Sequence, residues 1–227
     1  MSGAGQLIEN YDSVGYIINP FEDENITYLC GNADKSYSDR AKKCRRHLVY
    51  HKKNHYFVIV DEFITNESNS SAVEFNLHSW SKFNIDEEAK SFELVREGSG
   101  LKGYFLFHFN SFFTLTEGWD PKPKIDEIRS AWWPMQYHMK FTTCGYSKKR
   151  NLTTVLLPFH HKLKAPAINT IRDGETEIAH VGDDIVWSNQ LIYTNASGGG
   201  INSDALAVIK TKNTFYHIRE TGIQKEK

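Results

Sequence analysis

Short runs of alternating apolar and polar residues recur along the whole chain, and Gly, Pro, Asn and Ser residues separate them. An apolar residue at every second position is typical of a strand with one buried face, and many of these residues are β-branched or aromatic. Strands are predicted at residues 16–18, 26–30, 44–50, 56–63, 72–80, 92–96, 103–109, 112–117, 135–143, 152–158, 167–172, 175–180, 184–188, 205–210 and 214–220. The chain is therefore expected to be all-β.

Several polar segments between these runs contain the residues that tight turns require. Residues 51–55 are few enough to join two adjacent strands, and residues 172–175 contain an Asp-Gly pair that favours a two-residue hairpin. Residues 145–151 are expected to form a longer polar hairpin loop, and the glycine-rich segment 197–203 is expected to be a flexible loop. These turns predict antiparallel pairing between strands that are neighbours in sequence.

The run at residues 56–60, YFVIV, is apolar on both faces of its strand. A strand with this pattern is covered on both sides, so we predict two packed antiparallel sheets, a β-sandwich. Helical patterns occur at 86–90 and 124–130, and we expect short helical turns only in connections. A chain of 227 residues in which strands continue across every loop predicts that residues 1–227 form a single domain.

Composition narrows the classes of function. Lysine plus arginine number 27 and aspartate plus glutamate number 28, so no overall field attracts nucleic acid or an anionic membrane surface. We therefore expect no nucleic-acid partner and no membrane partner, and any anion binding has to be local. The three cysteines lack CxxC spacing, which argues against a disulfide framework and a zinc site. No metal ligand and no cofactor are assigned.

Several short motifs occur in an order that resembles the C-terminal β-domain of heparinase II/III-type polysaccharide lyases. The first group comprises Gly5-Gln6, Gly31-Asn32-Ala33 before Tyr37, Arg45-Arg46-His47, and the apolar run 56–60 that ends at Asp61. The second group comprises His78 and Trp80, Phe113 to Gly118, Gln136 to His138, and Val155 to Pro158. The resemblance covers nearly the whole chain.

The resemblance implies a scaffold whose catalytic residues lie elsewhere. In that family a helical toroid and a His/Asp-rich motif upstream of the Gly-Gln step supply the groups for β-elimination of uronate-containing polysaccharide, and here four residues precede Gly5. No catalytic residue is therefore carried over, and the chain alone is expected to be inactive. The implied partners are an anionic polysaccharide and a separately encoded helical toroid. Family members are usually periplasmic or secreted, although this chain begins without a secretory signal.

A stand-alone module that binds anionic glycan is the alternative function. Lys43, Arg45 and His47 share one face of a predicted strand, within the densest positive cluster of the chain. Such a cluster can hold sulfate or uronate groups through charge-assisted hydrogen bonds. A charged hairpin at a sheet edge, which discourages aggregation, explains the same residues without a ligand.

Three tryptophans in the long segment 118–134, which is expected to leave the sheet, extend the glycan-binding hypothesis. Trp119, Trp132 and Trp133 could stack on sugar rings, because their apolar faces suit the C–H face of a pyranose. Tryptophans beside prolines also commonly cover a sheet edge, which is the competing interpretation.

The remaining polar candidates have structural explanations. His47, His51 and His55 are spaced by four, but their strand–turn–strand context predicts solvated side chains rather than a metal site. Asp61 is expected to end its strand by bonding loop amides. His78 and His138 lie among apolar strand residues and are second-rank polar candidates, each expected to be half-buried.

Overall fold

The computed structural model describes residues 14–37, 41–66, 71–107, 110–118, 136–145 and 148–227. These residues are almost entirely β-structure, arranged as antiparallel sheets packed on one another, as the alternating pattern predicts. No helix in the described part is long and apolar enough to cross a membrane.

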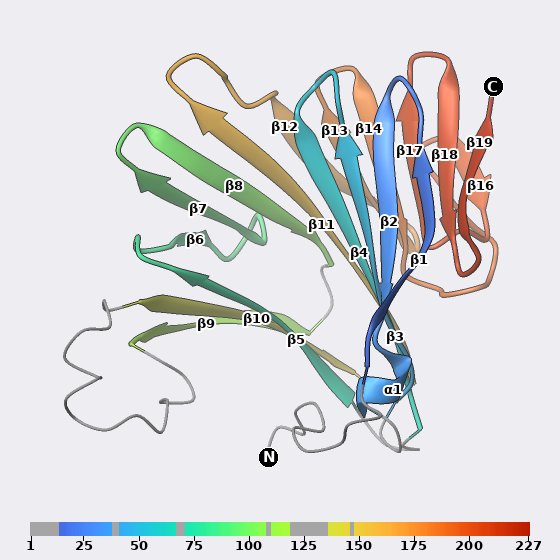
Figure 1. The fold of residues 1–227 in the computed structure, drawn as a ribbon, viewed down its shortest axis with the longest axis horizontal. Helices are drawn as coiled ribbons and strands as arrows, with labels where there is room; N and C mark the ends of the chain where they lie inside the picture. Colours follow the sequence, from blue (N-terminus) through green and yellow to red (C-terminus); the bar gives the residue numbers. More distant parts are fainter. Residues whose placement is uncertain (1–13, 38–40, 67–70, 108–109, 119–135, 146–147) are drawn as a thin grey trace.

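An eight-stranded antiparallel sheet forms the middle of the molecule (Figure 1). Its strands, in spatial order, are β1 (Tyr16–Glu22), β2 (Ile26–Asn32), β3 (Ala41–His51), β4 (Tyr56–Thr65), β11 (Lys149–His160), β8 (Ser99–Leu106), β7 (Ser91–Arg96) and β6 (Asn84–Asp86). One helical turn, α1 (Asp34–Tyr37), lies between β2 and β3. We call this the central sheet.

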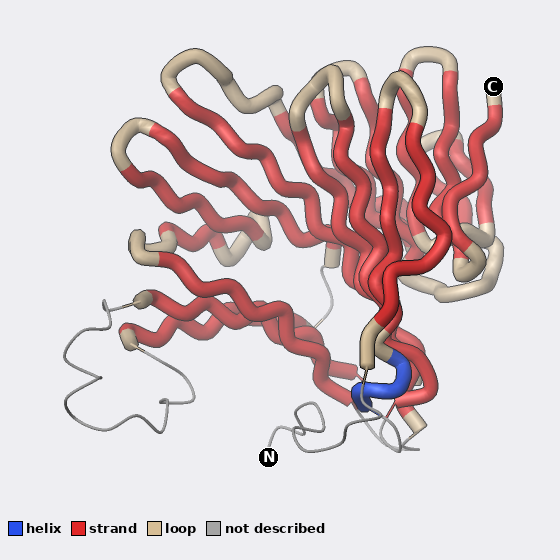
Figure 2. The backbone as a smooth tube through the Cα atoms, in the orientation of Figure 1, coloured by secondary structure: helices blue, strands red, loops and turns tan. Residues whose placement is uncertain are grey.

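Two other sheets cover the faces of the central sheet. The six-stranded sheet consists of β12 (Ile168–Asp173), β13 (Thr176–Val181), β14 (Asp184–Asn189), β17 (Ala207–Thr211), β18 (Thr214–Arg219) and β19 (Gly222–Glu226). The three-stranded sheet consists of β5 (Ser71–Ser79), β10 (Tyr137–Gly145) and β9 (Ser111–Glu117). A small hairpin of β15 (Ala196–Gly198) and β16 (Ile201–Ser203) completes the strands of the described part. Figure 2 shows the three-stranded sheet diverging from the central sheet on one side of the molecule.

Strand β4 shows why the central sheet has two covered faces. Tyr56, Val58 and Val60 point to one side and belong to the hydrophobic core shared with the six-stranded sheet. Ile59 points to the other side, into the core shared with the three-stranded sheet. The apolar run at 56–60 therefore correctly predicted a strand covered on both faces, and the sandwich has a third layer.

The two cores differ in composition. Aliphatic residues and tyrosines dominate the core that faces the six-stranded sheet, including Ile26, Tyr28, Val49, Tyr56, Val58, Val60, Val186, Leu206, Ile209, Tyr216 and Ile218. Phenylalanines dominate the core that faces the three-stranded sheet, with Phe75, Phe83, Phe92, Phe105, Phe107 and Phe141 all buried.

Some connections differ from the sequence prediction. Residues 145–151 were expected to close a hairpin, but β10 pairs with β5 and β9 whereas β11 pairs with β4 and β8, so this segment crosses between sheets. The segment 197–203 was expected to be a flexible loop, but β15 and β16 pair around Gly199 and Gly200, which both have positive φ. The hairpins at 51–55 and 172–175 are present as predicted.

Candidate functional site

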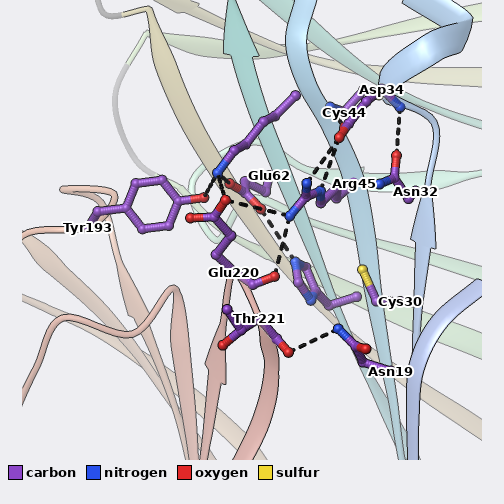
Figure 3. A network of polar contacts seen from close by, with 12 residues as sticks. Asn19, Cys30, Asn32, Asp34, Cys44, Arg45, Glu62, Tyr193, Glu220 and Thr221 are labelled. Atoms are coloured by element: carbon purple, nitrogen blue, oxygen red, sulfur yellow. Dashed lines mark hydrogen bonds and ion pairs between the residues drawn. The ribbon is translucent and has the colours of Figure 1, made fainter.

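Lys43 and Arg45 project from β3 toward Glu220, between β18 and β19 of the six-stranded sheet, and His47 contacts Tyr28 in the core below that sheet. Figure 3 shows Arg45 in this network, together with Glu62, Tyr193 and Glu220. Lys43, Arg45 and His47 share one face, as alternation predicted, but their side chains are only 13%, 15% and 0% exposed. Strand β3 lies between β2 and β4, so it is not an edge strand. These three side chains therefore lie largely inside the molecule.

Lys43 joins the central sheet to segments beside the six-stranded sheet. Its Nζ atom donates to the Tyr193 hydroxyl at 2.8 Å and also contacts the Glu220 carboxylate. The buried Glu62 carboxylate of β4 lies 3.5 Å from the same nitrogen. Two carboxylates and a phenol thus surround this ammonium group, which stabilises its charge away from bulk water.

Arg45 is held mainly by Asp34 of α1. Its Nη2 atom donates to Asp34 Oδ2 at 3.0 Å, and Nη1 donates to the backbone carbonyl of Glu220 at 3.3 Å. Burial opposes the charged form, but the hydrogen bond and charge of Asp34, with Glu62 and Glu220 nearby, raise the pKa of Arg45 overall. Asp34 also accepts from the amide of Cys44, so α1 is fixed against β3.

His47 lies at the inner end of this network. Its Nδ1 atom is 2.9 Å from the Tyr28 hydroxyl, and its Nε2 atom is 3.7 Å from Glu62. Burial raises the pKa of Tyr28 well above its ordinary value. A phenol, an imidazole and a carboxylate are groups suited to moving a proton, but all three are fully buried, or nearly so, and a polymer has no access to them.

A second buried network joins the β3–β4 turn to β14. Asp184 Oδ2 accepts from Asn54 at 2.6 Å and from the Tyr56 hydroxyl at 3.2 Å, and it lies 3.5 Å from His51 Nε2. The amide of Asn54 donates to His51 Nδ1 at 3.1 Å, so the neutral ring carries its proton on Nε2, toward Asp184. Burial lowers the pKa of His51, although the charge of Asp184 acts in the opposite direction.

A third polar link connects the β1–β2 turn to β18 and β19. Asp23 accepts from Lys225 at 2.7 Å, from the Tyr216 hydroxyl at 3.0 Å and from the amides of Asn25 and Ile26. Burial alone would raise the pKa of Asp23, but these hydrogen bonds lower it to about 2. The two larger sheets are therefore connected by ionised and hydrogen-bonded groups at several separate points.

The expectation of solvated histidines at this hairpin was wrong for two residues. His47 and His51 are buried because they point between the sheets, whereas His55 lies in the turn with positive φ and contacts the Tyr50 hydroxyl at 2.7 Å. Asp61 was expected to end its strand, but β4 continues past it. Its carboxylate instead binds Arg46 on the neighbouring strand at 2.6 Å.

The second-rank histidines lie together on the three-stranded sheet. His78 and His138 are cross-strand partners, and their rings stack with centroids 4.1 Å apart. His138 is buried and its Nε2 atom is 2.9 Å from Asn76 Oδ1, whereas His78 is exposed, so the expectation that each is half-buried was wrong. Trp119, Trp132 and Trp133 lie outside the described residues.

Among the described residues, the fold limits the chemistry of the possible metal ligands and of two cysteines through their surroundings. No group of three or more His, Cys, Asp and Glu side chains there is placed to hold a metal ion. Burial raises the pKa of Cys30 to about 11 and that of Cys44 to about 12, so both thiols stay protonated near neutral pH.

Sequence reasoning missed the residues that complete the networks. Tyr193 and Glu220 are 150 or more positions from Lys43 along the chain, and no local pattern pairs them with it. Glu62 follows Asp61, but the two carboxylates point to opposite faces of β4, toward His47 and Arg46 respectively. Sequence reasoning also missed the pair formed by the exposed Trp80 and Arg96, whose guanidinium carbon lies 4.8 Å from the Trp80 ring centroid. The two residues lie at the ends of strands from different sheets, so no local pattern pairs them.

No protein-family model and no curated protein matches the sequence. Solved structures share the fold: a heparan sulfate lyase mutant from Pedobacter heparinus superposes with a TM-score of 0.55 over 77% of this chain, at 14% identity. A heparinase III gene product gives 0.54 over 74% at 17% identity, and another heparinase III gives 0.51 over 87% at 16% identity. The matched part is about a quarter of those chains (26–27%), so this chain has the fold of one portion of them.

Proposed function

We propose that residues 1–227 form one β-domain of a heparinase II/III-like polysaccharide lyase, in which the domain supports a catalytic centre completed by other parts of the protein. The observation that carries this proposal is a fold shared over 77% of this chain with about a quarter (27%) of a heparan sulfate lyase. The order of motifs from Arg45 to Trp80 supports the same class. The intact class removes a proton next to a uronate carboxylate and expels the glycosidic oxygen.

The buried polar groups support an inactive role for the chain by itself. β-Elimination needs a base, an acid and a group that stabilises developing charge, all within hydrogen-bond reach of the sugar. The proton-transfer groups gathered on the central sheet, Tyr28, His47 and Glu62, face the six-stranded sheet and are sealed from solvent. The chain alone should therefore produce no unsaturated product.

Glycan binding by Lys43, Arg45 and His47 stays a prediction, and it requires existing contacts to open. A sulfate or uronate group would have to displace the Glu220 carboxylate from Lys43 and compete with Asp34 for Arg45. Both exchanges would replace an internal ion pair with an external one, so little net affinity is expected from this face.

An assay of the purified chain and of its association with a helical domain tests the proposed function. Heparan sulfate is added to the chain alone, and the ultraviolet absorbance of the unsaturated product should stay flat. The helical domain of a heparan sulfate lyase, supplied as a separate polypeptide, should co-elute with the chain in size-exclusion chromatography. Turnover by the chain alone would contradict the inactive role, and failure to associate would count against a completing role.

A further inference from the structure

Trp80 is exposed in a position fixed by a local turn. Its residue is 58% exposed, although tryptophan is usually among the well-buried residue types. It directly follows β5, and the Ser79 hydroxyl accepts from the amide of Ser81 at 2.9 Å across it. This short hydrogen-bonded turn holds the backbone of Trp80 at the end of the three-stranded sheet.

Arg96 approaches Trp80 from the central sheet. It is the last residue of β7, on the same strand face as Phe92 and Leu94, which pack toward the three-stranded sheet. Its guanidinium carbon lies 4.8 Å from the Trp80 ring centroid, which is a cation–π contact. Glu97 and Gly98 follow with positive φ, so the residue is placed by a tight hairpin turn.

Among the described residues, the Arg96 guanidinium contacts the Trp80 ring and Glu97, which leaves hydrogen-bond donors for a ligand. The Arg96 side chain is 53% exposed, and its contact with Glu97 at 3.7 Å joins two exposed groups and is weak. Lys43 and Arg45 differ from it, because their carboxylate partners hold them inside the molecule. Arg96 is therefore a cation that an external anion can reach without breaking a buried ion pair.

We propose that Trp80 and Arg96 form a subsite for a carboxylated or sulfated pyranose unit of a glycosaminoglycan chain. The sugar stacks its C–H face on the open part of the indole, and its carboxylate or sulfate accepts hydrogen bonds from the guanidinium fork. Trp80 directly follows a strand of one sheet and Arg96 ends a strand of another, so the subsite spans the end of the phenylalanine-rich core. The inference rests on the proposed lyase-domain function for the class of ligand.

Nuclear magnetic resonance of the full chain tests the subsite directly. The indole N–H signal of Trp80 is assigned by its loss in Trp80→Phe and followed during titration with a heparin-derived tetrasaccharide. It should shift saturably, and Arg96→Ala should weaken the affinity by about tenfold, as loss of a charge-assisted contact predicts. Isothermal titration calorimetry with the same tetrasaccharide measures the affinity of Trp80→Ala, which lacks the reporting indole, and this variant should show no binding. Arg96→Lys should be intermediate because it keeps the charge but loses the fork.

Tyr16 and Lys35 provide a matched control elsewhere on the surface. Tyr16 is 51% exposed and Lys35 Nζ lies 6.0 Å from its ring centroid, so Lys35→Ala also removes an exposed cation over an exposed aromatic ring. This variant should bind the tetrasaccharide as the wild type does. Circular dichroism and the urea midpoint confirm that each variant is folded.

The subsite would be overturned by no shift of the Trp80 signal in the wild type, by equal affinity of Trp80→Ala and the wild type, or by equal affinity for neutral maltotetraose. Equal weakening by Lys35→Ala would also overturn it, because binding would then depend only on net charge. Each of these results leaves association with the helical domain to be decided by its own assay, so the two proposals fail separately.

Discussion

The central sheet is covered in two different ways. On the face toward the six-stranded sheet, apolar packing is combined with partly buried ion pairs and hydrogen bonds at Asp23, Lys43 and Asp184. On the face toward the three-stranded sheet, aromatic rings pack with one another, and Phe105 and Phe141 stack with centroids 4.0 Å apart. Hydrogen bonds require a narrow range of distance and angle, whereas aromatic pairs are favourable in several arrangements, both offset-stacked and edge-to-face. The first interface should therefore fix the positions of the sheets, and the second should mainly contribute apolar burial.

The largest expected effect comes from the aromatic interface. Phe105→Ala removes a fully buried ring that also contacts Phe75, Phe92 and Phe113. Loss of a buried phenylalanine lowers the free energy of unfolding by about 3–5 kcal/mol, through lost transfer energy and a cavity. Urea unfolding followed by circular dichroism measures it. A loss below about 1 kcal/mol would show that the three-stranded sheet does not depend on this core.

Asn151 tests the directional links of the other interface. Its side-chain amide, on β11, donates to the carbonyls of Asn189 at 2.7 Å and Leu206 at 2.6 Å, across the gap between sheets. Asn151→Ala leaves two buried carbonyls without these donors and should lower the free energy of unfolding by about 2 kcal/mol. The exposed Asn84→Ala on β6 is the control and should change the urea midpoint little. Equal effects would contradict a special role for Asn151.

The buried His51 should make the stability of the chain depend on pH. Because its pKa is lowered in the folded chain, the unfolded chain binds the proton more readily. The contribution of His51 to the free energy of unfolding is complete above the ordinary histidine pKa. It is lost as the pH falls below that value, with a slope of at most about 1.4 kcal/mol per pH unit. His51→Gln should flatten the urea-midpoint profile between pH 7 and pH 5, roughly the range in which histidine titrates. An unchanged profile would show that other groups cause the acid sensitivity.

The smallest expected effect comes from Arg46, which points to the face opposite Arg45. Its side chain is 54% exposed, where it pairs with Asp61 and lies 5.2 Å from the Phe75 ring centroid. Arg46→Ala should cost less than about 1 kcal/mol, because exposed ion pairs contribute little. Arg45→Ala, the matched variant on the adjacent residue, leaves Asp34 without its guanidinium partner and should cost more. If Arg46→Ala lowered the urea midpoint more than Arg45→Ala, the distinction drawn between the two faces would be wrong.

The local part of this fold could be predicted from the sequence because alternation reports which side of a strand is apolar. The run at 56–60 predicted a strand covered on both faces, and residues 51–55 predicted a hairpin. The local sequence does not determine which sheet a strand joins. A polar loop such as 145–151 has the same composition whether it closes a hairpin or crosses to another sheet.

The candidate site could be predicted only in part for the same reason. Alternation correctly placed Lys43, Arg45 and His47 on one face. Their environment depends on Tyr193 and Glu220, which the fold brings from distant positions. Trp80 and Arg96 likewise meet only because two turns of different sheets end at the same place. Contacts between residues of different sheets can be identified only from the three-dimensional structure.

Because strand β4 contributes side chains to both cores, it affects how cooperatively the chain unfolds. Separating either outer sheet would expose one side of the same strand, so the loss of one core should destabilise the strand on which the other core is built. The backbone amides of β4 and its partner β11 should exchange with deuterium more slowly than those of β1 or β9. The three layers should accordingly melt in one transition, with the middle strand acting as the shared element that couples them.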